Sequence, residues 1–305
     1  MGTAERAVAQ SPALTGVFLA ALGAIAFSGK AIIVKLGFRY GADAITLLAL
    51  RMLVAMPFFL LLGAWSSRRQ VEPVSAADRC RIVLLGILGY YLASFLDFLG
   101  LAYITATLER LILYLTPTIV LLIGVLVFRR SVTPRQVLAL AISYAGVLLA
   151  FAHDFSIGGS NVVLGGGLVF LSALSYSLYL VGVGEIVARV GAIRLTAYAS
   201  TVACILCIGQ YLLLRSLDTA MQLPVEVWWL SLLNGTLCTV VPVLAVMMAV
   251  ARIGPATTAQ IGMLGPVSTI VLSMLLLGEP MGPWQVAGTL LVLVGVWVVS
   301  RKPSA

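Results

Sequence analysis

Apolar residues form long stretches along this chain, and short polar segments separate them. A helix needs about 20 mostly apolar residues to cross the hydrocarbon core of a bilayer. Ten stretches have about that length: 13–36, 44–64, 80–101, 105–128, 134–152, 163–185, 195–214, 226–250, 256–277 and 281–300. The pattern therefore predicts an all-α membrane protein with ten transmembrane helices.

The composition agrees with a membrane protein. Of the 305 residues, 61% are hydrophobic and only 10% are charged, and the mean hydropathy is +1.11. A soluble domain carries about 25% charged residues because its surface faces water. Little chain remains between the apolar stretches, so we expect no extramembrane enzyme, no nucleotide-binding module and no cofactor.

The net charge of +8 indicates topology rather than nucleic-acid binding. If the N-terminus is cytoplasmic, thirteen Lys and Arg residues fall in inner segments, whereas only Lys35, Arg39 and Arg215 fall near outer loops. Cytoplasmic segments of membrane proteins carry this excess of positive charge. We therefore predict that both ends of the chain are cytoplasmic. Arg outnumbers Lys sixteen to three, which indicates a GC-rich bacterial genome and hence a bacterial inner membrane.

The second half of the chain repeats the first at an offset of 149 residues, without a gap. Pro117 corresponds to Pro266, and Gln136 corresponds to Gln285. Each half holds five apolar stretches, an odd number, so the second half should cross the membrane in the opposite sense, as in many secondary transporters. We expect a cytoplasmic N-terminus (1–12), a first five-helix repeat (13–152), an external linker (153–162), a second five-helix repeat (163–300) and a cytoplasmic tail (301–305).

The turn at 277–280 reads Leu-Gly-Glu-Pro and is followed by Gln285 and Gly288. Together with the two halves and the Pro near the start of each fourth helix, this turn makes the chain resemble the EamA branch of the drug/metabolite transporter superfamily. The first half departs from the pattern at 128–131, which reads Phe-Arg-Arg-Ser. The resemblance implies alternating access and export of amino acids or related metabolites. Within the family, the length and the aromatic-lined spans look most like bacterial exporters of aromatic and other hydrophobic amino acids.

Five ionisable residues lie inside predicted spans of the first repeat: Lys30, Arg51, Asp97, Glu109 and Arg110. Ionisable groups in a membrane are expensive, and they often mark a functional site. With a cytoplasmic N-terminus, all five fall in the outer half of the membrane. They either pair with one another to neutralise buried charge, or they line a vestibule that binds the ammonium and the carboxylate of a zwitterion. In the second interpretation Asp97 or Glu109 could also carry a proton in exchange for substrate.

Polar and aromatic side chains extend this candidate cavity along single helix faces. Tyr90 and Ser94 share a face with Asp97, and Tyr114 shares one with Arg110. We also assign Ser175, Tyr179 and Gln260 to the cavity, although Ser and Tyr in a bundle can equally bond neighbouring helices. The repeat-matched Pro117 and Pro266 are the hinge candidates, because a Pro within a span frees a carbonyl and permits bending.

Other functional classes fit the sequence less well. The chain has no H-E-x-x-H, no G-x-S-x-G, no P-loop sequence and no His inside a predicted span, so we expect no catalytic residues, no metal and no use of ATP. Cys204 and Cys207 form a C-x-x-C inside an apolar helix, where they should behave as small apolar side chains. A channel usually needs a ring of identical groups, whereas an inverted repeat favours alternating access.

Among transporters, the first alternative is efflux of drugs or organic cations. Small drug exporters of the superfamily use a Glu in the first helix, where this chain has Lys30 and no acid. A sugar- or nucleotide-type metabolite is a further alternative. The sequence leaves open proton antiport or uniport, and a monomer or a weak homodimer.

Overall fold

The computed structural model describes residues 4–69, 74–129, 133–158, 160–262, 264–279 and 282–300. These ranges are helical apart from short turns, and they contain no β-strand. The elements in chain order, with π-helical segments marked η, are α1 (Ala4–Arg39), α2 (Ala44–Arg69), α3 (Ala76–Gly86), η1 (Ile87–Leu92), α4 (Ala93–Leu101), α5 (Ala106–Leu113), α6 (Thr116–Phe128), α7 (Pro134–Gly158), α8 (Ser160–Val190), α9 (Ala192–Leu214), α10 (Leu217–Met221), α11 (Val225–Gly235), η2 (Thr236–Val240), α12 (Val241–Gly262), α13 (Leu264–Leu272), η3 (Ser273–Leu277) and α14 (Pro283–Ser300).

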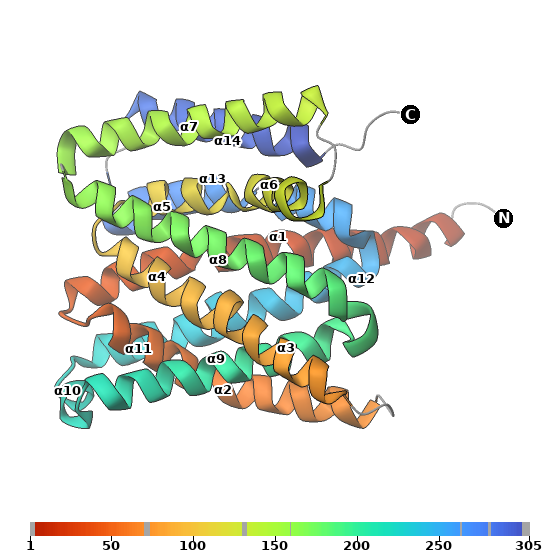
Figure 1. Cartoon of the computed structure of the whole chain (residues 1–305), viewed down its shortest axis with the longest axis horizontal. Helices are drawn as coiled ribbons and strands as arrows, with labels where there is room; N and C mark the ends of the chain where they lie inside the picture. Colours follow the sequence, from red (N-terminus) through yellow and green to blue (C-terminus); the bar gives the residue numbers. More distant parts are fainter. Residues whose placement is uncertain are drawn as a thin grey trace.

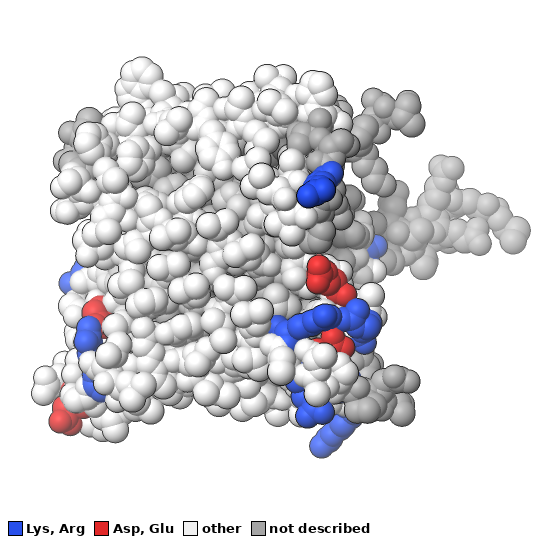
Figure 2. All heavy atoms as spheres, in the orientation of Figure 1, with Lys and Arg blue, Asp and Glu red and all other residues white. Residues whose placement is uncertain are grey.

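The long helices run side by side across the view of Figure 1. Eight helical spans in the described part are long and apolar enough to cross a membrane, and two further apolar helices, Leu264–Leu277 and Pro283–Val298, are shorter. Charged side chains gather at the two ends of the molecule, with an uncharged band between them on the visible face (Figure 2). Side chains such as Leu213 and Leu126 are 86% and 79% exposed, as expected for a surface in contact with lipid. The all-α prediction is confirmed, and the chain is a multi-pass membrane protein.

The two halves of the chain interrupt their helices at corresponding positions. The π-helical segment η1 begins at Ile87, and η2 begins at Thr236, which is 149 residues later. A π-helical turn inside a helix frequently marks a functional site. The repeat found in the sequence is therefore also a repeat of local backbone structure.

Local residues explain where the helices turn. Thr105 caps the start of α5, because its side-chain oxygen accepts a hydrogen bond from the Leu108 backbone nitrogen at 3.1 Å. The corresponding residue of the second half, Gly254, interrupts α12 with a φ of 77°. Glycine adopts this left-handed conformation without steric cost. The predicted boundary between the stretches 226–250 and 256–277 falls at this turn.

Helices α7 and α14 pack against each other at one edge of the bundle (Figure 1). Gly146 on α7 faces Gly288 on α14 so closely that a Cβ added to either glycine would lie 2.6 Å from the carbonyl oxygen of the other. Small residues at such crossings let two backbones approach closely inside a membrane. These glycines therefore serve a contact within the chain.

The segment expected to form an external linker, 153–162, is mostly helical. Helix α7 continues to Gly158, and α8 begins at Ser160. The physical reason lies at Asp154, which is 5% exposed and accepts hydrogen bonds from Thr105 Oγ1 at 2.7 Å and from Gln285 Nε2 at 3.2 Å. Hydrogen bonds from the Thr105 and Gln285 side chains thus satisfy the buried Asp154 carboxylate, so α7 can continue through this position.

Candidate functional site

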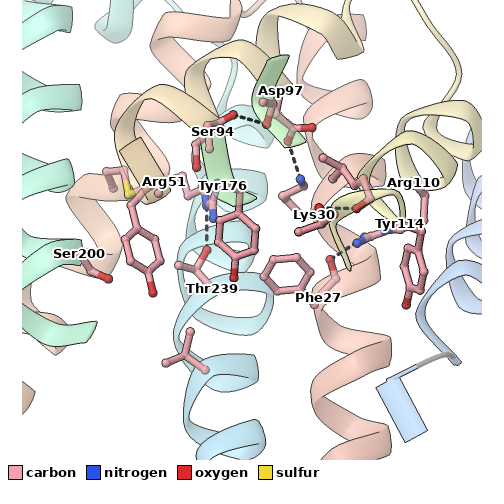
Figure 3. Close-up of a pocket in the computed structure, with 18 of the residues that line it drawn as sticks. Phe27, Lys30, Arg51, Ser94, Asp97, Arg110, Tyr114, Tyr176, Ser200 and Thr239 are labelled. Carbon is pink, nitrogen blue, oxygen red and sulfur yellow. Dashed lines mark hydrogen bonds and ion pairs between the residues drawn. The ribbon is translucent and has the colours of Figure 1, made fainter. Parts of the chain in front are cut away.

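A cavity of about 400 Å³ lies inside the bundle between the two halves. Helices α1, α2, α4, α5 and α6 with η1 line it from the first half, and α8, α9, η2 and α12 line it from the second half. Figure 3 shows charged, aromatic and hydroxyl side chains converging on this space. The lining consists of Phe27, Lys30, Arg51, Met52, Phe59, Gly89, Tyr90, Ala93, Ser94, Asp97, Arg110, Leu113, Tyr114, Thr116, Pro117, Ser172, Tyr176, Ser200, Thr239 and Val243.

One ammonium group holds two carboxylates at the edge of the cavity. Lys30 Nζ lies 2.5 Å from Asp97 Oδ2 and 2.9 Å from Glu109 Oε1. All three side chains are buried. Asp97 Oδ1 and Glu109 Oε2 have no hydrogen-bond partner among the described residues. Because an unpaired buried charge is costly, both carboxylates depend on Lys30, and we call these three residues the lysine triad.

Arg51 on α2 is 6% exposed and carries its charge into the cavity wall. Its Nε donates a hydrogen bond to Thr239 Oγ1 of η2 at 2.8 Å (Figure 3). Its guanidinium carbon lies 5.3 Å from the centre of the Phe98 ring, a cation–π contact. Its Nη1 is buried and has no hydrogen-bond partner within the described part of the chain. Arg51 therefore presents an unused donor.

Arg110 on α5 is bound mainly to neutral groups. Its Nε donates to Thr269 Oγ1 at 3.0 Å, and its Nη2 donates to the Phe27 carbonyl oxygen at 3.1 Å. The Phe27 ring lies 5.6 Å from the Arg110 guanidinium carbon and 5.9 Å from Lys30 Nζ. The Phe27 ring thus makes a cation–π contact with both cations.

A wall of tyrosine side chains covers part of the cavity. The hydroxyls of Tyr90 and Tyr179 lie 3.0 Å apart, and the Tyr176 ring stacks on Tyr179 with ring centres 5.4 Å apart. Tyr179 itself packs behind Gly89, where an added Cβ would collide with the ring. Ser175 donates its hydroxyl to the Leu88 carbonyl at 2.8 Å, so it links α8 to η1.

The structure brings most predicted site residues together. Eight of them line the cavity, namely Lys30, Arg51, Tyr90, Ser94, Asp97, Arg110, Tyr114 and Pro117. Glu109, Ser175 and Tyr179 lie behind the lining and contact it. Pro266 is buried in α13 away from the lining, and the side chain of Gln260 lies outside the described part.

Several lining residues were missed by sequence reasoning, although the repeat contains a signal for them. Shifting a lining residue of the first half by 149 positions gives another lining residue in four cases. The pairs are Phe27 with Tyr176, Arg51 with Ser200, Tyr90 with Thr239, and Ser94 with Val243. The two halves thus contribute equivalent positions to one cavity, and applying the offset to the candidates Arg51, Tyr90 and Ser94 would have found Ser200, Thr239 and Val243.

Polar contacts tie α1 to the second half at the end of the molecule where α1 terminates. Lys35 Nζ lies 3.5 Å from Glu279 Oε1, and the same oxygen accepts a hydrogen bond from the Ala106 backbone nitrogen at 3.1 Å. Arg39 donates to the Leu277 carbonyl oxygen. Glu279 of the Leu-Gly-Glu-Pro turn therefore binds both α1 and the start of α5, where a carboxylate also suits the helix dipole.

Within the described residues, no group of three His, Cys, Asp or Glu side chains is arranged to hold a metal ion. The acidic oxygens of the cavity belong to the lysine triad, and the other polar groups of the lining are cations and hydroxyls. Such a set can bind and orient an anionic or hydroxylated solute.

Comparisons with known proteins agree with this architecture. Residues 14–152 and 163–301 each match the model of the EamA-like transporter family. The chain is 29% identical over 290 residues to the uncharacterized transporter YcbK of Bacillus subtilis, covering 90% of this chain and 89% of that protein. It is 23% identical over 285 residues to an uncharacterized transporter of Archaeoglobus fulgidus, covering 93% and 96%. One solved crystal structure aligns with a TM-score of 0.63 and 17% identity over 95% of this chain and 96% of that chain, which shows a shared fold.

Proposed function

We propose, from the premise that this chain belongs to the EamA-like transporter family, that it exports small polar metabolites and that aromatic and hydrophobic amino acids are its substrates. The family and the relatives establish a membrane transporter. The substrate class rests on the chemistry of the cavity.

The observation that supports this proposal is one cavity that combines buried cations with aromatic walls. Ligand sites for small molecules are usually 300–1,000 Å³, mostly apolar, with a few polar groups that fix orientation. The cavity of about 400 Å³ is at the lower end of that range and suits one amino acid. Arg51 supplies the charge for a carboxylate, and Phe27, Phe59 and Tyr176 supply surface for an apolar side chain.

We place this cavity near the centre of a ten-span bundle with inverted halves, and both ends of the chain in the cytoplasm of a bacterial cell. The end of the molecule where α1 begins and α14 ends carries the larger gathering of Lys and Arg in Figure 2. Basic residues favour the cytoplasmic side. The two shorter apolar helices both lie in the second half and bring it to five spans, the same number as in the first half. The proposed repeats, 13–152 and 163–300, follow from that count.

Alternating access would then proceed by rocking one half against the other around the cavity. Pro117 lies in the first turn of α6, and Pro266, its equivalent at the offset of 149 residues, lies in α13. These positions suit hinges. In this proposal the contacts of Glu279 with Lys35 and Ala106 form the external gate, which is closed in the present conformation.

Asp97 and Glu109 are the candidates for proton coupling. Two carboxylates that share one ammonium in a buried site repel each other, which favours protonation of one of them whenever the ammonium moves away. Movement of α1 against α5 during transport would produce that separation. The competing mechanism is uniport, in which accumulated metabolite leaves down its own gradient.

The cations in the cavity argue against the alternative of organic-cation efflux. Lys30, Arg51 and Arg110 would repel a positively charged drug, and both acidic groups are already bound to Lys30. A sugar- or nucleotide-type phosphate is an alternative anionic substrate to the carboxylate of an amino acid, and the transport test below includes it.

The test is uptake of labelled amino acids into liposomes that hold the purified protein, with and without an imposed pH gradient. We expect accumulation of phenylalanine or leucine that other apolar amino acids compete away. Stimulation by the pH gradient would support antiport, and its absence would support uniport. Transport of a quaternary ammonium ion or a sugar phosphate, without transport of any amino acid, would refute the proposed substrate class.

A further inference from the structure

The charges around the cavity do not balance. Three cations, Lys30, Arg51 and Arg110, meet two carboxylates, Asp97 and Glu109, and both carboxylates are bound to Lys30. Among the described residues neither Arg51 nor Arg110 has a carboxylate within 4.0 Å. The cavity therefore holds one more positive charge than negative charge when all five groups are ionised.

Arg51 and Arg110 differ in what they leave unused. Arg110 donates from two nitrogens to Thr269 and to the Phe27 carbonyl. Arg51 donates only from Nε, to Thr239, and keeps Nη1 buried without a partner in the described part of the chain. A buried donor that makes no hydrogen bond is expensive, and the expense is greater for a charged group. A ligand oxygen that accepts a hydrogen bond from Nη1 would remove this energetic cost.

The surroundings of Arg51 hold its guanidinium in place for such a ligand. Phe98 packs against it at 5.3 Å from ring centre to guanidinium carbon, and Thr239 fixes Nε from the second half. Figure 3 shows the Arg51 side chain above Thr239 and joined to it by the dashed hydrogen bond. A preorganised arginine of this kind is well suited to a carboxylate, because its planar donors match the carboxylate oxygens.

We propose that the cavity selects organic monocarboxylates with an apolar or aromatic body, that Arg51 Nη1 binds the carboxylate, and that the α-ammonium of an amino acid is dispensable. This inference rests on the proposed function and narrows its recognition chemistry. The ammonium is dispensable because both carboxylates already contact Lys30 and the five ionised groups together carry one net positive charge, which disfavours a further cation in the cavity. The excess positive charge is balanced by the carboxylate of the substrate.

The same geometry separates three analogues that share one benzyl body. A carboxylate without an amine, 3-phenylpropionate, keeps the group that Arg51 binds. An amine without a carboxylate, 2-phenylethylamine, lacks that group and adds a cation to a cavity that already has an excess. The methyl ester of phenylalanine keeps the amine but loses the carboxylate charge. Arg51 should therefore accept the first and reject the other two.

The experiment measures how each analogue competes with labelled phenylalanine for transport in liposomes that hold the purified protein, and how each raises the thermal unfolding temperature of the protein in detergent. We expect 3-phenylpropionate to compete within about tenfold of unlabelled phenylalanine, and the amine and the ester to be at least about a hundredfold weaker. If the amine competes as well as 3-phenylpropionate while phenylalanine is transported, the inference fails and the proposed function stands. If 3-phenylpropionate binds and is transported but no amino acid is, the inference stands and amino acids fail as substrates. If no carboxylate competes or stabilises, the inference is overturned.

Variants locate the carboxylate at one residue. We expect Arg51→Gln to raise the KM for phenylalanine at least about tenfold, since truncating one partner of a buried charge pair is strongly unfavourable for binding, and to abolish the preference for 3-phenylpropionate over 2-phenylethylamine. Arg215→Gln is the matched control, because Arg215 is 38% exposed and pairs with Asp43 outside the cavity. An Arg51→Gln protein that retains the preference would overturn the assignment. If that variant does not fold, the competition with the unchanged protein still decides the question.

Discussion

Removing the ammonium of Lys30 should destabilise the protein more than removing any other single charge. Lys30 is 4% exposed and contacts Asp97 at 2.5 Å and Glu109 at 2.9 Å. In Lys30→Met the side chain keeps a similar length and loses its charge. Two buried carboxylates would then lose the same partner, and Asp97 Oδ1 and Glu109 Oε2 already have no hydrogen bond in the described structure.

The expected magnitude follows from this geometry. Breaking a buried ion pair by removing one partner costs about 3–5 kcal/mol, because the remaining charge stays buried without compensation. Lys30→Met leaves two such charges, so we expect a loss of about 5 kcal/mol in the free energy of unfolding. A typical folded protein has only about 5–15 kcal/mol in total. Much of the Lys30→Met protein should therefore fail to reach the folded state near pH 8.

Neutralising the carboxylates as well should restore stability. The triple variant Lys30→Met/Asp97→Asn/Glu109→Gln removes all three charges, and replacing a complete buried ion-pair cluster with neutral groups is often close to neutral in stability. Equilibrium unfolding in mixed micelles would compare the single variant, the triple variant and the unchanged protein. Lys35→Met is the matched control, since Lys35 is 23% exposed in its side chain and lies 3.5 Å from Glu279, so its loss should cost under about 1 kcal/mol. Equal unfolding free energies for Lys30→Met and Lys35→Met would refute the buried triad.

Two further predictions concern packing and an ion pair outside the cavity. Gly288→Ala should lower the free energy of unfolding by about 1–3 kcal/mol, because the added Cβ would lie 2.6 Å from the Gly146 carbonyl oxygen and push α7 away from α14. Equilibrium unfolding in mixed micelles measures this loss. An unchanged free energy of unfolding would show that the two helices can separate without cost. Burial opposes ionisation of Asp43, but hydrogen bonds from Thr46 and the charge of Arg215 outweigh it and lower the pKa of that carboxyl below its usual value. Since the folded pKa is the lower one, the pair stabilises the fold above the unfolded pKa and loses this contribution as the pH falls through the folded pKa. Asp43→Asn should therefore be less stable than the unchanged protein at pH 7, by under about 1 kcal/mol because the pair is more than one-third exposed. This difference should shrink as the pH falls through the folded pKa, and a difference that does not change with pH would contradict the ion-pair explanation.

The sequence was sufficient to predict helices and the repeat, because both depend on patterns along the chain. Apolar stretches of membrane-spanning length predicted the helices, and the offset of 149 residues appears again in the starts of η1 and η2. The sequence could not predict which charged side chains pair with each other inside the cavity. Charge type and depth allowed Asp97 to bind Lys30, Arg51 or Arg110, and only the positions of the helices show that Lys30 takes Asp97 and Glu109 together.

The contribution of the second half was harder to predict for a related reason. Ionisable groups inside a span draw attention because they are expensive in a membrane, and all five belong to the first half. Tyr176 and Thr239 carry no charge, and in a membrane helix such residues more often bond neighbouring helices. Their place in the cavity depends on the fold, which sets them opposite Phe27 and Arg51.

The distribution of charge over two equivalent halves has a consequence for the transport cycle. The position that corresponds to Arg51 in the second half is Ser200, and the one that corresponds to Lys30 is Tyr179, whose hydroxyl lies 3.0 Å from that of Tyr90. If the two halves exchange roles between outward-facing and inward-facing states, the cavity keeps equivalent shapes in both states but the charges stay with the first half. The proposed anion-binding site then moves with the first half alone, so the electrostatic field in the cavity differs between the two states. Because a difference in affinity between two states can bias their equilibrium, the asymmetric charges give the substrate a means of favouring one state in an otherwise symmetric scaffold.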